Sequence, residues 1–183
     1  TCHPYLPVDD AANDNRLIPV VSLPTLAWDP PMPQRCTAPE AFALVDRSAD
    51  VYGVAHFLLH PQIMGTQPDD AMAKLVPELA DYARKKGMAW WTAEQIWEWF
   101  CLKRQARIDA RKEHGKTWVT VTAAAAVHGL TVLVSDEAGT LRVDAADSPC
   151  IRSSERKQRF GRGVLELVLD APAGTTRIAL VSG

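Results

Sequence analysis

The sequence predicts an α/β fold followed by a small antiparallel β-domain, because the hydrophobic pattern changes along the chain. Up to about residue 114, apolar runs alternate with amphipathic segments, which is typical of strands and helices in a parallel sheet covered by helices. Beyond Gly115, short alternating segments separated by glycine-containing turns indicate antiparallel strands. The change predicts two domains, residues 1–114 and residues 115–183.

The composition is that of a globular protein and argues against several functional classes. Hydrophobic residues make up 47% of the 183 residues and charged residues 23%, with a net charge of −2 at pH 7. A charge near zero argues against nucleic acid as a partner, because proteins that bind it carry a basic face. No apolar run approaches the roughly 18 residues of a membrane-spanning helix. The four widely spaced cysteines do not predict a zinc site and leave the redox compartment open.

The first sixty residues predict a helix between two strands. Closely spaced prolines up to residue 40 indicate loops and short extended pieces, with a strand at residues 17–23. A helix is expected at residues 38–48. Residues 51–60 form a near-continuous apolar run that ends in His60-Pro61, which predicts a strand buried on both faces.

An amphipathic helix is expected next. Apolar side chains recur at helical spacing between residues 72 and 83, Asp69 or Asp70 is the expected N-cap, and Gly87 the expected stop. Pro77 lies inside this segment and predicts a kink or an interruption, because proline lacks the N–H that an interior helical position donates.

The rest of the chain predicts a short strand, another helix and the β-domain. A strand is expected at residues 88–91, followed by a helix that opens with the capping-box pattern Thr92-Ala-Glu-Gln95 and becomes strongly charged beyond Leu102. A basic cluster between residues 152 and 162 is expected to be a solvated loop. The predicted β-domain strands are residues 118–122, 130–134, 140–144, 164–169 and 177–181.

His60 is the first candidate for chemistry because it ends the predicted buried strand. Carboxyl ends of strands face the active site in many α/β folds, and histidine exchanges protons near pH 7. The alternative is a strand-terminal histidine bonded only to the backbone. His56 lies about 13 Å away along a strand, so the two do not share a metal ion, and His56 is interpreted as a core histidine with one hydrogen bond.

An aromatic cluster is the other candidate binding feature. It could stack on sugars, although packing on a helix face is the expected role. Its members are Trp90, Trp91, Trp97 and Trp99.

The order of several short motifs resembles the end of a polysaccharide deacetylase (NodB-homology) domain, most closely its allantoinase-like branch. Pro4-Tyr5 and Arg16-Leu-Ile-Pro-Val20 are similar to the stretch that follows the central segment of that family. The resemblance covers roughly residues 1–105. The later motifs are Phe57-Leu-Leu-His60-Pro61, Gly65, the amphipathic helix, Gly87, Trp90 and Thr92-x-x-Gln95-Ile96-Trp97.

The resemblance implies a distorted (β/α) barrel that hydrolyses an amide, typically the N-acetyl group of a sugar or a small amide, with a divalent metal such as zinc. The segment Leu58-Leu59-His60 matches the family's Leu-x-His motif, which would make His60 the general acid and Leu58 part of the acyl-pocket wall. Trp28-Asp29 is similar to the motif in which an aspartate supports the catalytic machinery. Asp29 is therefore expected to be catalytic and Trp28 to bind substrate.

Two motifs of the family's N-terminal half, Thr-Phe-Asp-Asp and the metal-binding His-Ser/Thr-x-x-His, do not occur in the sequence. Thr1 is therefore interpreted as a break in the middle of the barrel, and this chain alone is expected to hold no metal. The alternative function is a non-catalytic carbohydrate-binding or assembly module. Residues 115–183 lie outside the resemblance, and the role of this β-domain could be packing, oligomer formation or glycan contact.

Overall fold

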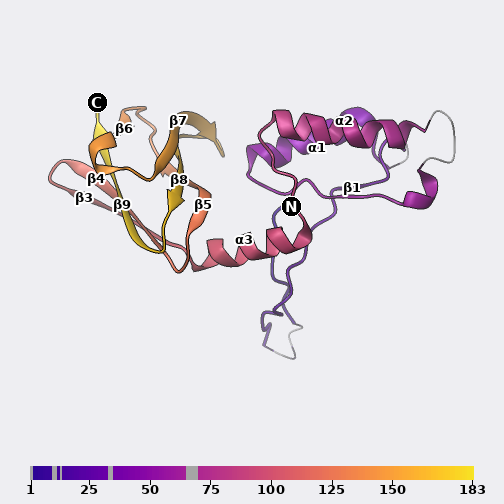
Figure 1. Ribbon diagram of the computed structural model, residues 1–183, viewed down its shortest axis with the longest axis horizontal. Coiled ribbons are helices and arrows are strands. Elements are labelled where there is room, and N and C mark those ends of the chain that lie inside the picture. Colours follow the sequence, from indigo (N-terminus) through magenta and orange to yellow (C-terminus); the bar gives the residue numbers. More distant parts are fainter. Residues whose placement is uncertain (1, 10–11, 13, 33–34, 65–69) are drawn as a thin grey trace. The chain divides into compact units, whose positions relative to one another are not determined.

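A computed structural model describes the whole chain except residues 1, 10–11, 13, 33–34 and 65–69. It contains helices and strands together, as the mixed pattern of the sequence predicts. The chain divides into two compact units, Thr1–Thr92 and Ala93–Gly183 (Figure 1). The boundary expected between residues 114 and 115 lies inside a β-hairpin of the second unit, because residues 107–113 pair with the strand that follows them.

The first unit has the order strand, helix, strand, helix. Its strands β1 (Ala27–Trp28) and β2 (Phe57–Leu58) are parallel neighbours, and α1 (Ala38–Asp50) lies between them in the chain. A tight turn cannot join parallel strands, so the connection needs a crossover of this kind. The 3-10 turn η2 (Pro61–Ile63) and helix α2 (Ala71–Lys85) follow β2.

Both helices of this unit begin at side-chain caps. The Thr37 hydroxyl accepts from the Glu40 N–H, and the Glu40 carboxylate accepts from the Thr37 N–H, so the two residues form a capping box at α1. Asp70 caps α2 by accepting from the N–H groups of Met72 and Ala73. The structure therefore confirms one of the two expected N-caps of α2.

Helix α2 ends where expected and continues where an interruption was expected. Gly87 has a φ of 78°, a left-handed conformation that glycine adopts without strain after a helix. Pro77 lies on the exposed side of α2, and the helix runs past it without interruption. Asp69, the other candidate cap, and Gly65 lie outside the described residues.

Helices α1 and α2 pack over a small apolar core. Ala27 of β1 and Phe57 of β2 contact this core, so it covers one face of the two-stranded sheet. At its margin, the rings of Tyr82 and Phe42 meet edge-on with centroids 5.0 Å apart, and the Tyr82 hydroxyl donates to Asp46. The buried members of the core are Cys36, Ala41, Val45, Leu75 and Leu79.

Three strands expected in this region are shorter or absent. Residues 17–23 contain only isolated bridges, and the proline at position 19 lacks the N–H of a continuous ladder. The run 51–60 is reduced to β2, because α1 continues to Asp50 and Tyr52 turns the backbone at a φ of 56°. Residues 88–91 form no strand.

The second unit consists of one helix and two antiparallel sheets. The elements are α3 (Ala93–Gln105), β3 (Arg107–Glu113), β4 (Lys116–Ala123), β5 (Val127–Ser135), β6 (Leu141–Val143), the 3-10 turn η3 (Ala145–Asp147), β7 (Ile151–Arg159), β8 (Arg162–Ala171) and β9 (Gly174–Ser182). One sheet has the strand order β3-β4-β9-β6 and the other β5-β8-β7.

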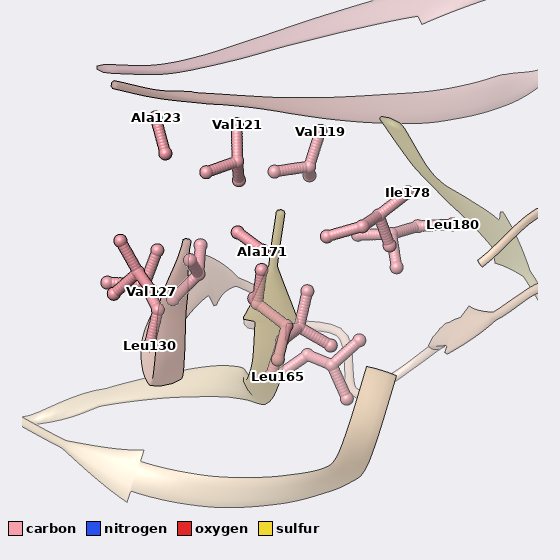
Figure 2. Close-up of a cluster of buried hydrophobic side chains, with 12 residues drawn as sticks. Val119, Val121, Ala123, Val127, Leu130, Leu165, Ala171, Ile178 and Leu180 are labelled. Atoms are coloured by element: carbon pink, nitrogen blue, oxygen red, sulfur yellow. The ribbon is translucent and has the colours of Figure 1, made fainter. Parts of the chain in front are cut away.

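Side chains from both sheets form the main core of the second unit. Figure 2 shows Val119, Val121 and Ala123 projecting from β4 into the cluster that contains Leu165 and Ala171 of β8. Every second residue of these strands enters the core, which is the alternation that the sequence shows. Burial of these aliphatic groups is the main stabilising contribution to the unit.

Two strands of this unit lie where no strand was expected. The helix that was expected to continue through the charged residues beyond Leu102 ends at Gln105. The charged residues after it form β3 at the edge of a sheet. The basic cluster expected as a solvated loop is β7 and the turn to β8. Four of its five basic side chains form ion pairs with acidic ones. The nitrogen–oxygen distance is 3.1 Å between Arg152 and Asp170 and 3.5 Å between Arg156 and Asp136. Glu166 is contacted by Lys157 at 2.5 Å and by Arg159 at 3.8 Å.

Two further observations concern the chain as a whole. Within the described ranges, no helix has both the length and the apolar character needed to cross a membrane. All four cysteines are free thiols, and Cys36 is buried in the core between α1 and α2.

Candidate functional site

Asp29 and His60 meet at the carboxyl edge of the small parallel sheet. Asp29 directly follows β1, and His60 lies two residues after β2. Because the two strands are parallel, both residues leave the sheet at the same edge. The Asp29 N–H donates to the Leu58 carbonyl at 2.9 Å, and the His60 N–H donates to Oδ1 of Asp29 at 2.9 Å. A backbone hydrogen bond thus fixes Asp29 beside β2, and the Asp29 carboxylate in turn binds the backbone of His60.

The Asp29 carboxylate is bound by two side chains. His60 Nδ1 lies 3.0 Å from Oδ1 and 2.9 Å from Oδ2, and the Arg35 guanidinium contacts Oδ2. The carboxylate is fully buried, whereas the His60 side chain is 38% exposed and that of Arg35 is 44% exposed. A buried carboxylate therefore holds an imidazole that remains accessible to solvent.

The backbone of Asp29 has a conformation uncommon for a residue with a side chain. Its φ is 44°, in the left-handed region, which aspartate tolerates better than most residues. The Met32 N–H donates to the Asp29 carbonyl at 3.0 Å and closes the turn that leads to Arg35. Strained backbone of this kind is concentrated at functional sites, where surrounding contacts maintain it.

Opposing effects set the pKa of Asp29. Burial alone would raise the pKa, but the hydrogen bonds from the His60 side chain and N–H, together with the charges of His60 and Arg35, lower it below its ordinary value. An ionised carboxylate only accepts hydrogen bonds, so Nδ1 of His60 is the donor between them. Nε2 is then the nitrogen available to exchange a proton, and it has no hydrogen-bond partner among the residues that the structure describes.

Trp28 and Leu58 lie beside this pair. They are opposite one another in the parallel register, on the face of the sheet away from the α1–α2 core. Trp28 is 54% exposed and Leu58 37% exposed. Two accessible apolar side chains therefore adjoin the Asp29–His60 pair.

All four site residues expected from the sequence are therefore close together in the structure. Arg35 was not expected at the site; the turn after Asp29 brings its guanidinium back to the Asp29 carboxylate. A basic residue six positions after the candidate aspartate, with three prolines between them, was the available signal. His60 is not a residue bonded only to the backbone, because Nδ1 contacts a side chain.

Other expectations turned out differently. Trp90, Trp91 and Trp97 are 71%, 42% and 41% exposed, so packing on a helix face is wrong for these three. Nδ1 of His56 is buried and has no hydrogen-bond partner in the described part of the chain, so that atom does not make the expected bond. No cluster of three or more His, Cys, Asp or Glu side chains suited to a metal ion occurs in the same part.

The chain was compared with known protein families, proteins and structures. No protein-family model, curated protein or solved structure matches the chain. The geometry around His60 and the motif order of the sequence therefore carry the functional proposal.

The pKa of Asp29 predicts a pH-dependent contribution to stability. Because this pKa is lower in the folded state, the contribution is fully present above the ordinary aspartate range, near pH 4, and is lost as the pH falls through the folded-state value. We expect Asp29→Asn to lower the urea midpoint at about pH 7 and to differ less from the unsubstituted protein at about pH 3.

The matched control is Asp81→Asn, whose side chain is 64% exposed and forms an ion pair with Arg84 on the surface of α2. It should leave the urea midpoint nearly unchanged at both pH values, because surface ion pairs contribute little to stability. A constant difference between Asp29→Asn and the unsubstituted protein across this pH range would contradict the prediction.

Proposed function

We propose that His60, oriented by Asp29, acts as the general acid in the hydrolysis of an amide, in a deacetylase-like site. The observation that carries the proposal is the buried carboxylate bound to Nδ1 of an accessible histidine at the carboxyl edge of parallel strands. A histidine held in one tautomer by a carboxylate is a recurrent device for moving protons in catalysis. The motif order around His60 supports the amide as the bond that is broken.

The chemistry assigns a task to each residue. Hydrolysis adds the oxygen of water to the acyl carbon, breaks the C–N bond and leaves a nitrogen that needs a proton. Nε2 of His60 supplies that proton to the departing amine, while Nδ1 remains bonded to Asp29. Arg35 holds the same carboxylate and is a positioning residue. Trp28 and Leu58 form an apolar wall for the acyl group.

The proposed site belongs to a (β/α) barrel that binds a divalent metal. The order β1, α1, β2, α2 with parallel strands supports assigning this region to the C-terminal part of a distorted (β/α) barrel. The resemblance also implies a divalent metal such as zinc. The described residues do not form a site that fits such an ion, so we derive no step through a metal.

The test uses the longest natural protein that contains this chain, purified with zinc. Release of free amine is measured from N-acetylated amino-sugar oligomers and from small amides. We expect amine release from at least one of these classes. A folded protein that hydrolyses none of them would overturn the proposal.

A second candidate function, carbohydrate binding without catalysis, is favoured by the exposure of Trp90 and Trp91. Exposed tryptophans stack on apolar faces of sugars. If the same oligomers bind without being hydrolysed, and if Trp90→Ala abolishes that binding, this second function replaces the first.

A further inference from the structure

Strand β3 is an open edge of the four-stranded sheet. It is the terminal strand in the order β3-β4-β9-β6 (Figure 1), and all seven of its residues are exposed. Its only strand neighbour in the described structure is β4. Every second residue of such a strand directs its N–H and C=O away from the sheet, so another strand can add there.

The charges on β3 alternate in sign along one face. Arg107, Asp109, Arg111 and Glu113 occupy every second position, and alternate residues of a strand project to the same side. Asp109 and Arg111 already contact each other at 2.7 Å, and Glu113 contacts Arg177 of β9 at 3.1 Å. This face therefore carries the order positive, negative, positive, negative.

We propose that β3 pairs antiparallel with β3 of a second copy of this chain, about a two-fold axis at Ala110. In this register Arg107 lies opposite the partner's Glu113, and Asp109 lies opposite the partner's Arg111. Symmetry repeats both pairs, so four oppositely charged pairs cross the junction. Cross-strand pairs of opposite charge stabilise a sheet, whereas like charges destabilise it.

The neighbouring registers are electrostatically unfavourable. Antiparallel registers that keep the charged residues of both strands on the same face of the sheet differ from one another by two residues. A shift in one direction places Arg111 opposite itself and Asp109 opposite Glu113. A shift in the other direction places Asp109 opposite itself and Arg107 opposite Arg111. The charge pattern therefore favours one register.

The other face of β3 fits the same register. Ile108 is 52% exposed, and its partner across the junction is Lys112 of the second copy, whose aliphatic stem can cover it. Ala110 lies opposite Ala110 of the second copy, and these two small side chains allow the backbones to approach closely. An isologous contact of this kind uses up the β3 edge of both copies and closes as a dimer.

The test measures the monomer–dimer equilibrium of the full chain by sedimentation equilibrium. Arg111→Asp alone, or Asp109→Arg alone, replaces attraction by repulsion at two symmetry-related pairs. We expect each variant to dimerise about tenfold or more weakly than the unsubstituted chain. In a mixture of the two variants, every changed residue faces an opposite charge, so the mixture should form heterodimers.

Arg84→Asp is the matched control, because Arg84 also belongs to an exposed arginine–aspartate pair, on helix α2. It should dimerise like the unsubstituted chain. Circular dichroism checks that every variant retains its strands. The proposal is overturned if the unsubstituted chain stays monomeric at about 1 mM, if either single variant dimerises as well as the unsubstituted chain, or if the mixture remains monomeric.

Discussion

Replacing His60 by alanine should lower the rate of amide hydrolysis by at least about 100-fold, the usual contribution of a positioned general acid. The reason is the position of Nε2, which has no described hydrogen-bond partner and belongs to an imidazole fixed by Asp29. The measurement is amine release at saturating substrate by the longest natural protein that contains this chain. Because His60 is partly exposed, its replacement should not unfold the protein.

A second histidine–aspartate pair provides the matched control. Nδ1 of His128 lies 3.4 Å from Asp170, and the His128 side chain is 79% exposed in the second unit. His128→Ala should leave amine release unchanged. Asp29→Asn should lower the rate by about 100-fold as well, because an amide cannot replace the carboxylate that keeps Nδ1 a donor. Equal losses in the His60 and His128 variants would contradict the assignment.

Substrates with different leaving groups distinguish a catalytic role of His60 as proton donor from a purely structural role. A 4-nitroanilide expels a weakly basic amine that needs little protonation, whereas an alkyl amide expels a strongly basic one. We expect His60→Ala to impair hydrolysis of the alkyl amide much more than hydrolysis of the anilide. A structural role would reduce both rates by the same factor and would remove His60 from the chemistry.

The second large effect concerns stability. Leu167 lies on β8, the central strand of its sheet, and is fully buried in the core between the two sheets. We expect Leu167→Ala to lower the free energy of unfolding of the β unit by about 2–5 kcal/mol, through lost apolar burial and the cavity that remains. Urea-dependent hydrogen exchange of amides in β4, β8 and β9 measures the change where it occurs.

Phe160→Ala is the comparison for this substitution. Phe160 is 68% exposed in the turn between β7 and β8, so its truncation should change the free energy of unfolding by less than about 0.5 kcal/mol. A similar loss of exchange protection in both variants would show that burial of Leu167 is not the source of the effect.

Periodicity predicted the elements whose stability depends on one apolar face. Helices α1 and α2 and strands β4, β5, β8 and β9 bury alternate or helically spaced side chains, and that spacing is visible in the sequence. Strand β7 is polar along almost its whole length, and β3 carries only two apolar residues, Ile108 and Ala110, between its charged ones. Pairing with β4 and β8 determines their conformation, and single-sequence patterns do not contain it.

The site shows the same division between local and long-range information. His60-Pro61 after an apolar run indicated the histidine, and the motif resemblance indicated Asp29, Trp28 and Leu58. The contact between Asp29 and His60 joins residues 31 positions apart and depends on the parallel pairing of β1 with β2. The approach of Arg35 depends on the conformation of a turn, which side-chain spacing did not reveal.

The ion pairs along β7 also determine the electric field around the second unit. A cation a few ångströms from an anion acts at a distance as a dipole, whose potential decays faster than that of a free charge. Arg152 and Arg156 are compensated in this way by separate aspartates, Lys157 and Arg159 both contact Glu166, and Lys157 also contacts Glu155. With a Debye length of about 8 Å at physiological ionic strength, little of their charge reaches an approaching polyanion. Mobility in an electric field and retention on a cation exchanger should therefore follow the net charge of −2 more closely than the density of arginine and lysine along this strand.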